Sequence, residues 1–165
     1  MISTAPDIRE KPKPHVPREL RESTGYLLGR LGFGLKTRSI KEFELAGLNP
    51  YYYAVLALLD EGACQSQVTI AESLRLDRSQ LVGLLDEMEE RGLVDRRRDT
   101  ADRRRHVVSL TPNGRRVLDD CRTIKQRLED ELLAPLDGEK RATLHGLLLE
   151  LAAHSDPRFA PGGQS

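Results

Sequence analysis

The sequence predicts a mainly helical protein that carries one small β-hairpin. Apolar residues recur three and four positions apart in successive segments between residues 18 and 154, which is the spacing of amphipathic helices. A different pattern lies within residues 93–110, where apolar and β-branched residues flank a run of turn formers. At 165 residues, with 32% charged and 38% hydrophobic residues, the chain is long enough for one domain with a buried core.

The N-terminal part is predicted to be an arm followed by helices. Residues 1–17 contain four prolines among mixed charges, and we expect them to be disordered or extended. Residues 18–46 keep helical spacing, interrupted by glycines that favour the close approach of another helix or of a ligand. These glycines are Gly25, Gly29, Gly32 and Gly34. Asn49 and Pro50 then form a typical helix start, and that helix is expected to end near Glu61.

Two short helices joined by a tight link follow. Ser66 caps the first helix, and Asp77 caps the second with Gln80 at its third helical position, a capping-box pattern. Gly92 is a typical residue to end the second helix. We therefore predict a helix-turn-helix at about residues 66–91.

The hairpin that follows holds nearly all of the local excess of positive over negative charge outside the N-terminal arm. The chain has 26 basic and 26 acidic residues, and this formal net charge of zero argues against a nucleic-acid partner. However, residues 91–105 contain seven arginines and carry a net charge of +4, whereas residues 22–90 carry −5. Arginine forms forked contacts with phosphates and base edges. A recognition-type helix beside a basic hairpin, or wing, is typical of a protein that reads duplex DNA.

Two amphipathic helices are expected after the hairpin. Thr111 and Pro112 start a long helix that runs through Leu133, with Cys121 on its apolar stripe. Asp137 caps a last helix, and residues 155–165 are expected to form a flexible tail. The apolar stripe of the last helix is Leu144, Leu147, Leu148 and Leu151.

Several classes of protein are excluded by what the sequence lacks. No apolar run approaches the roughly 20 residues that span a bilayer, and the N-terminus has no apolar segment of a secretory signal. Two cysteines are too few for a disulfide framework, so we expect a cytoplasmic protein. The four histidines are too scattered for a metal site, and no nucleophile–base pair or glycine-rich phosphate loop is found. We expect neither an enzyme nor a cofactor.

These motifs resemble those of the MarR family of bacterial winged helix-turn-helix regulators. The main match runs from Gly92 to Arg96 and continues from Asp102 to Gly114, where an Asp-x-Arg pair precedes the second strand and Leu-Thr-x-x-Gly opens the next helix. The helix-turn-helix match covers residues 67–74 and 77–79, and a third match lies at residues 47–50. The resemblance covers residues 18–154.

The resemblance implies a homodimer on a palindromic operator in double-stranded DNA. Helices within residues 18–46 and 111–154 would interlock as the dimerisation region, with the wing at about residues 93–110. Arg104 would enter the minor groove, oriented by Asp102. The expected DNA contacts are Ser66, Gln67, Arg78, Ser79, Gln80, Val82, Gly83, Arg96, Arg98, Asp102, Arg103, Arg104 and Arg105.

Three features depart from the family pattern. Asp86 and Glu87 place acidic groups on the recognition helix, where relatives often have neutral or basic residues. Gly83 has no side chain with which to read a base. Arg75 replaces the small residue that is common in the turn. These departures bear on the operator sequence rather than on the mode of binding.

The resemblance also implies a repressor that a small organic anion or aromatic effector releases, in a bacterial cytoplasm and on the nucleoid when bound to its operator. The candidate ligand contacts are Leu28, Gly29, Tyr51 and Tyr53. Two alternatives remain open. The same fold could sense oxidants through Cys64 or Cys121, or it could be a protein-interaction module that does not bind DNA.

Overall fold

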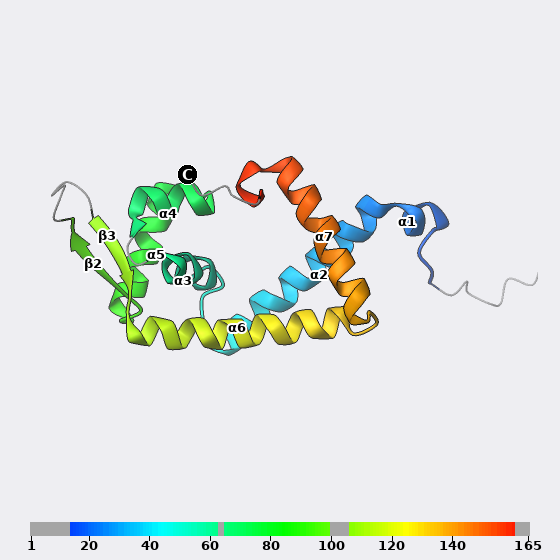
Figure 1. The fold of residues 1–165 in the computed structure, drawn as a ribbon. Helices are drawn as coiled ribbons and strands as arrows, with labels where there is room; N and C mark the ends of the chain where they lie inside the picture. The colour runs from blue at the N-terminus through cyan, green and yellow to red at the C-terminus, as the bar shows by residue number, and fades with distance from the viewer. Residues whose placement is uncertain (1–13, 63–64, 100–105, 161–165) are drawn as a thin grey trace, which may run out of the picture. The chain divides into compact units, whose positions relative to one another are not determined.

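The structure is a computed structural model, and it describes residues 14–62, 65–99 and 106–160. The chain forms two compact units, residues 1–37 and residues 38–165. Figure 1 shows the helices and strands in chain order. The mainly helical fold with a small β-hairpin is confirmed. None of the helices in the described ranges is long and apolar enough to cross a membrane.

The first unit contains α1 (Arg18–Glu22) and most of α2 (Thr24–Leu45). The prediction of a single helix over residues 18–46 is therefore wrong at one point, because the helix is interrupted at Ser23. The backbone of Ser23 is extended, and its hydroxyl accepts a hydrogen bond from the Tyr26 N–H at 3.2 Å. A serine in this position satisfies a free N–H of the first turn, so it starts a new helix.

The second unit contains the remaining elements. They are the last turns of α2, α3 (Tyr52–Glu61), β1 (Gln65–Ser66), α4 (Gln67–Leu74), α5 (Arg78–Glu90), β2 (Val94–Arg98), β3 (His106–Leu110), α6 (Pro112–Leu133), α7 (Gly138–Ser155) and the 3₁₀ turn η1 (Pro157–Phe159). The sheet order is β1-β3-β2, with both pairings antiparallel. The hairpin of β2 and β3 is the predicted wing, whereas β1 was not predicted because a two-residue strand leaves no period to detect.

The predicted caps set most of the helix starts. The side chains of Ser66, Asp77, Thr111 and Asp137 each accept a hydrogen bond from a backbone N–H two or three residues later. The exception is Asn49, which was expected to cap a helix beginning at Pro50. Its side-chain oxygen accepts from the Tyr51 N–H at 3.0 Å, and α3 begins only at Tyr52.

The core joins α3, the helix-turn-helix and the base of the wing. Its buried apolar side chains are Tyr52, Val55, Leu56, Leu59, Ile70, Leu81, Leu85, Met88, Leu93, Val94, Val108 and Leu118. Because Leu81, Leu85 and Met88 lie on one side of α5, the other side of that helix is left at the surface.

The Leu-Thr-x-x-Gly motif connects the wing to α6. The Thr111 hydroxyl donates to the carbonyl of Gly92 at 2.7 Å, and the same oxygen accepts from the Gly114 N–H at 2.9 Å. A Cβ atom on Gly114 would lie 2.0 Å from the Leu93 carbonyl oxygen. Only glycine therefore fits where this helix starts against the base of the wing.

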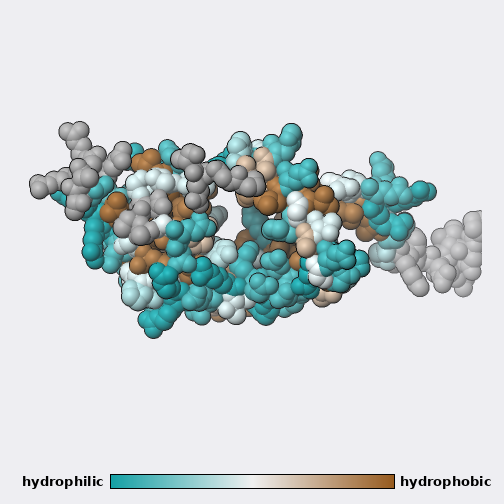
Figure 2. Space-filling model, viewed as in Figure 1, coloured by the Kyte–Doolittle hydropathy of each residue, from teal (hydrophilic) through white to brown (hydrophobic). Residues whose placement is uncertain are grey.

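The last helix, α7, has no buried residue. Its leucines Leu147, Leu148 and Leu151 are between 41% and 56% exposed, and Figure 2 shows this apolar surface open to solvent. The expected flexible tail does not start at residue 155. Ser155 still belongs to α7, and the next residues form the capped turn η1.

Candidate nucleic-acid interface

The outer face of α5 carries the expected recognition residues. Arg78, Ser79, Gln80, Val82 and Gly83 are all exposed. A Cβ atom on Gly83 would meet nothing within 4 Å, so this glycine leaves the middle of the face open and flat. The structure brings these five residues together on one surface, and their contact with DNA stays a prediction.

The first turn of α5 is held by Asp77. Its carboxylate accepts the N–H groups of Ser79 at 2.8 Å and Gln80 at 3.4 Å, and it also accepts the Ser79 hydroxyl. These hydrogen bonds, that of the hydroxyl first, lower the pKa of the Asp77 carboxyl. The Ser79 hydroxyl proton is thus committed to the cap, and its oxygen is available to a partner only as an acceptor.

The start of α4 is built in the same way. The Ser66 hydroxyl accepts from the Thr69 N–H at 3.1 Å and lies 2.8 Å from the Thr69 hydroxyl. Gln67, the first residue of α4, lines a cleft of about 400 Å³ together with Val82, Glu89, Arg96 and His106. Ser66 and Gln67 therefore lie beside the wing and near one edge of the recognition helix.

Two arginines of the described part of the wing are exposed. Arg97 and Arg98 project from β2, and the guanidinium of Arg97 lies 3.5 Å from the Asp95 carboxylate. Asp102, Arg103, Arg104 and Arg105 lie outside the described residues. The expectation that they contact DNA is therefore carried by the sequence alone.

Arg96 differs from its neighbours because its side chain is engaged within the fold, and its contact with DNA stays a prediction. Its side chain is only 20% exposed and turns back onto α5, 2.5 Å from a Glu89 oxygen and 2.6 Å from an Asp86 oxygen. The hydrogen bond to Glu89 and that to Asp86 raise the pKa of Arg96, and the guanidinium lowers the pKa of Glu89. Arg96 thus braces the wing against the recognition helix and pairs with Asp86, one of the two acidic residues that depart from the family pattern.

A second polar network also supports the C-terminal half of α5, through Glu87 and Arg91. The Tyr52 hydroxyl donates to Glu87 at 2.6 Å and accepts from Arg91 at 3.2 Å. Arg91 also donates to the Gly47 carbonyl at 3.0 Å, and its guanidinium lies 5.3 Å from the centre of the Tyr52 ring. Burial and then the Glu87 carboxylate raise the pKa of Tyr52. Tyr52 was predicted as core, but no sequence signal indicated its partners, which lie 35 and 39 positions away.

A cavity of about 350 Å³ lies between this network and the recognition face. Tyr51, which is 62% exposed, lines it from the start of α3. Its other lining residues are Asn49, Leu76, Ser79, Gln80, Gly83, Leu84 and Glu87. Of the expected ligand contacts, only Tyr51 lines this cavity. Tyr53 lies under the Lys125 ammonium at 5.9 Å, and Leu28 and Gly29 belong to the first unit.

Cys121 is fully buried on α6. Burial, followed by the nearby Asp120 carboxylate, raises the pKa of its thiol to about 11. This environment keeps the thiol protonated and therefore unreactive towards oxidants. Cys64 lies outside the described residues. Within the described ranges no cluster of histidine, cysteine, aspartate and glutamate side chains could hold a metal ion.

An exposed recognition helix held beside a basic wing defines a winged helix-turn-helix protein. The family model described as MarR family matches residues 48–106. A protein of Thauera aromatica, named as a candidate transcriptional regulator of the hcr operon, is 31% identical in an alignment of 135 positions that covers 77% of this chain and 81% of that protein.

Solved structures give the same result. CouR, a transcriptional repressor bound to a 23-mer DNA duplex, is 33% identical, with a TM-score of 0.73 over 84% of this chain and 99% of that chain. CouR from Rhodococcus jostii RHA1 bound to p-coumaroyl-CoA is 29% identical, with a TM-score of 0.69 over 88% of this chain and all of that one. The chain belongs to the MarR family. It is a DNA-binding transcriptional regulator of that family and not an enzyme.

Proposed function

We propose that this protein is a homodimeric repressor that binds a palindromic operator and leaves it when a small aromatic or acidic ligand occupies the cavity beside α5. The observation that carries this proposal is the recognition face of α5. This face is exposed and flanked by wing arginines, and the opposite side of the helix is packed into the core. This face is of a size and shape that enters a major groove. The arginines beside it would contact the adjacent phosphates or the minor groove.

The exposed leucines of α7 support the homodimer. A monomer that left Leu147, Leu148 and Leu151 in water would expose an apolar stripe on the second half of α7. Apolar side chains of α2, Leu27, Leu28 and Leu31 among them, are exposed in the first unit as well. A second copy of the chain could cover both stripes. A two-fold dimer would then read two half-sites about 10 bp apart from centre to centre.

The cavity beside α5 supports the response to a ligand. Its wall includes Ser79, Gln80 and Gly83, which also form the recognition face. A ligand held there would displace or cover residues that the operator needs. The exposed ring of Tyr51 offers a stacking surface for an aromatic ligand. Such a ligand acts only to the extent that it binds the free dimer more tightly than the dimer on DNA.

The test is selection of a binding site by the purified full-length protein from a library of random duplexes, followed by a shift assay on the selected sequence. We expect a palindrome with half-sites about 10 bp apart and a dimer in sedimentation at the concentrations used. A selection that yields no sequence would contradict the proposal and favour the protein-interaction alternative.

The ligand is tested on the selected duplex with a panel of aromatic acids. We expect at least one to release the DNA from the wild type, and the replacement Tyr51→Ala to weaken that release more than it weakens DNA binding. Tyr53→Ala is the matched control, since Tyr53 lies two residues further along, in the first turn of α3, and does not line the cavity. If both variants respond to the acid as the wild type does, the cavity is not the ligand site.

A further inference from the structure

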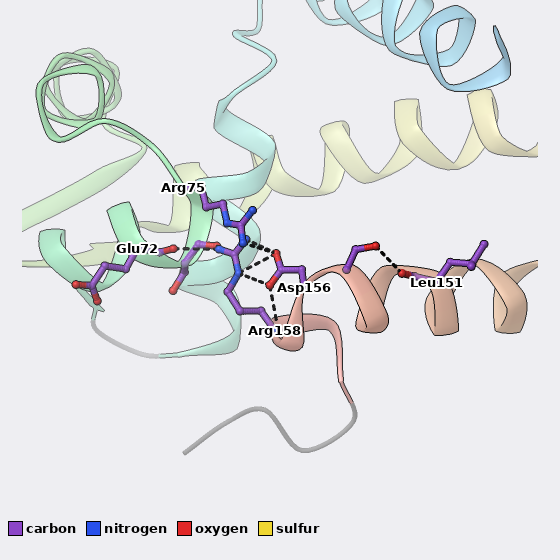
Figure 3. Close-up of polar contacts among 7 residues, drawn as sticks. Glu72, Arg75, Leu151, Asp156 and Arg158 are labelled. Atoms are coloured by element: carbon purple, nitrogen blue, oxygen red, sulfur yellow. Dashed lines mark hydrogen bonds and ion pairs between the residues drawn. The ribbon is translucent and has the colours of Figure 1, made fainter. Parts of the chain in front are cut away.

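The end of the chain is fastened to the helix-turn-helix by a cluster of three charged side chains. α7 ends at Ser155, and Asp156 then caps η1 by accepting the Arg158 N–H at 3.2 Å. The Arg158 guanidinium folds back onto the Asp156 carboxylate, with its closest contact at 2.6 Å. The Arg75 guanidinium lies 3.2 Å from the same carboxylate. Figure 3 shows the ends of Arg75 and Arg158 next to one another, both facing Asp156.

Arg158 also closes the end of α4. One of its nitrogens donates to the carbonyls of Glu72 at 3.0 Å and Ser73 at 2.7 Å. The last carbonyl groups of a helix lack N–H donors from within the helix and lie at the negative end of its dipole. A guanidinium supplies both the missing N–H donors and a positive charge. This contact joins residues 85 and 86 positions apart in the sequence.

The third member, Arg75, has an unusual backbone. With φ at 50° and ψ at 41°, it is left-handed, and it is the only residue other than glycine with a positive φ in the described ranges. Helices commonly end in this conformation on glycine, because a Cβ atom disfavours it. The arginine that departs from the family pattern in the turn thus has a structural partner, the Asp156 carboxylate.

Asp156 is well placed to hold both arginines. It is 8% exposed, although it lies next to the C-terminal turn. The Arg158 hydrogen bonds hold its pKa at about 2, so the carboxylate is charged throughout the physiological range. A buried carboxylate that is held by several hydrogen bonds from Arg158 presents its charge to Arg75 in a defined direction, which an exposed ion pair between two mobile side chains does not do.

The position of this cluster matters because of what it connects. Arg75 lies two residues before Asp77, the cap that starts the recognition helix. Asp156 directly follows α7, the helix whose leucines we assign to the dimer. The cluster therefore ties the turn that aims α5 to the end of a dimer helix, without passing through the core.

We propose that Asp156 and Arg158 are positioning residues for operator binding, which set the place of the recognition helix relative to the dimer by holding Arg75 and the end of α4. This inference rests on the proposed function, because it assumes a dimer that reads two half-sites. The two residues touch no DNA themselves.

The test is the replacement Asp156→Asn in the full-length protein, measured on the duplex that the wild type selects. The replacement removes one negative charge from a protein that binds a polyanion, so a purely electrostatic effect would tighten binding. Loss of positioning would instead weaken it. We expect at least a tenfold loss of affinity for the selected duplex and no loss for an unrelated duplex. We also expect a weaker preference for the best half-site spacing when the two half-sites are moved apart by one or two base pairs.

A second variant separates positioning from stability. Arg75→Gly removes the ion pair but suits the left-handed backbone, so its melting temperature should equal or exceed that of the wild type while its affinity and spacing preference fall. Lys140→Ala is the matched control, because it removes an exposed ion pair in the first turn of α7 and should change neither.

The outcomes separate the two proposals. If the wild type selects no duplex, the proposed function fails and this inference fails with it. If the wild type selects a duplex and both variants bind it as tightly as the wild type does, with the same spacing preference, the positioning role alone is overturned. The same holds if the affinity falls only in proportion to a lowered melting temperature.

Discussion

Replacing Gly114 by alanine tests how closely the wing is docked on α6. Gly114 lies in the first turn of α6 and is buried against Leu93, the residue with which the chain enters the wing. An added Cβ atom would lie 2.0 Å from the Leu93 carbonyl oxygen and 2.9 Å from the Leu110 side chain. Real Cβ atoms essentially never come within 3.0 Å of another heavy atom, so the Leu93 backbone would have to move by about 1 Å or more.

The size of the effect follows from three contributions. Forcing extra volume into a packed site costs typically 1–3 kcal/mol, and a contact with backbone belongs at the upper end. The shift would also stretch the hydrogen bond that the Leu93 carbonyl accepts from the Thr111 N–H at 3.2 Å, worth about 1 kcal/mol. Alanine recovers about 1 kcal/mol through its higher helix propensity. We expect a net loss of about 2–3 kcal/mol in the free energy of unfolding.

The assay is urea denaturation at one fixed protein concentration, because the stability of a dimer depends on concentration. Gly146→Ala is the control, since nothing lies within 4 Å of a Cβ atom at that position inside α7. The control should gain up to about 1 kcal/mol. A Gly114→Ala protein as stable as the wild type would refute the close docking of the wing.

Three further predictions concern Cys121, Arg96 and Arg98. With a thiol pKa of about 11, roughly one Cys121 in ten thousand is ionised at neutral pH. In a Cys64→Ser background the folded protein should therefore react with iodoacetamide only as fast as it unfolds. Rapid alkylation would instead support oxidant sensing by Cys121. Arg96→Ala should cost about 1 kcal/mol in the free energy of unfolding, because it leaves Asp86 and Glu89 without their shared partner. Arg96 lowers the pKa of Glu89, so this stabilisation is present above about pH 4.3 and is lost as the pH falls through the lowered pKa of the folded protein. The difference in unfolding free energy between wild type and variant should therefore shrink in acid. A constant difference down to pH 2 would count against the pairing. On the selected duplex, Arg98→Ala should reduce the steepness of the logarithmic salt dependence by about 0.9 per lost phosphate contact, whereas Arg96→Ala should leave it unchanged; equal effects would mean that Arg96 also reaches the DNA.

The sequence predicted the elements whose signals are local. Ser66, Asp77, Thr111 and Asp137 each cap a helix through a hydrogen bond to a residue two or three positions away, so their side chains and spacing suffice to identify them. The wing was predicted for the same reason, since strands and turn are contiguous in the sequence. Ser23 is a local cap as well, but it lies inside an apolar pattern that continues on both sides of it.

The parts that could not be predicted depend on partners far away in the chain. The sequence could not show that Arg96, alone among the described wing arginines, turns towards Asp86 and Glu89. Nor could it show that Asp156 meets Arg75, because the two are separated by α5, β2, β3, α6 and α7. A charged residue looks the same in a sequence whether it faces solvent, DNA or an opposite charge, and only its neighbours in the fold distinguish these cases.

The most direct test of the account is the affinity of Arg104→Ala for the selected palindrome in a salt-titrated shift assay. The account assigns sequence-specific binding to a recognition helix assisted by the wing, and the net charge of +4 over residues 91–105 is the part of the sequence that attracts DNA. We expect Arg104→Ala to abolish binding to the palindrome at physiological salt, while Lys140→Ala binds it as the wild type does. Unchanged binding of Arg104→Ala across the titration would contradict the wing's role and with it the central claim.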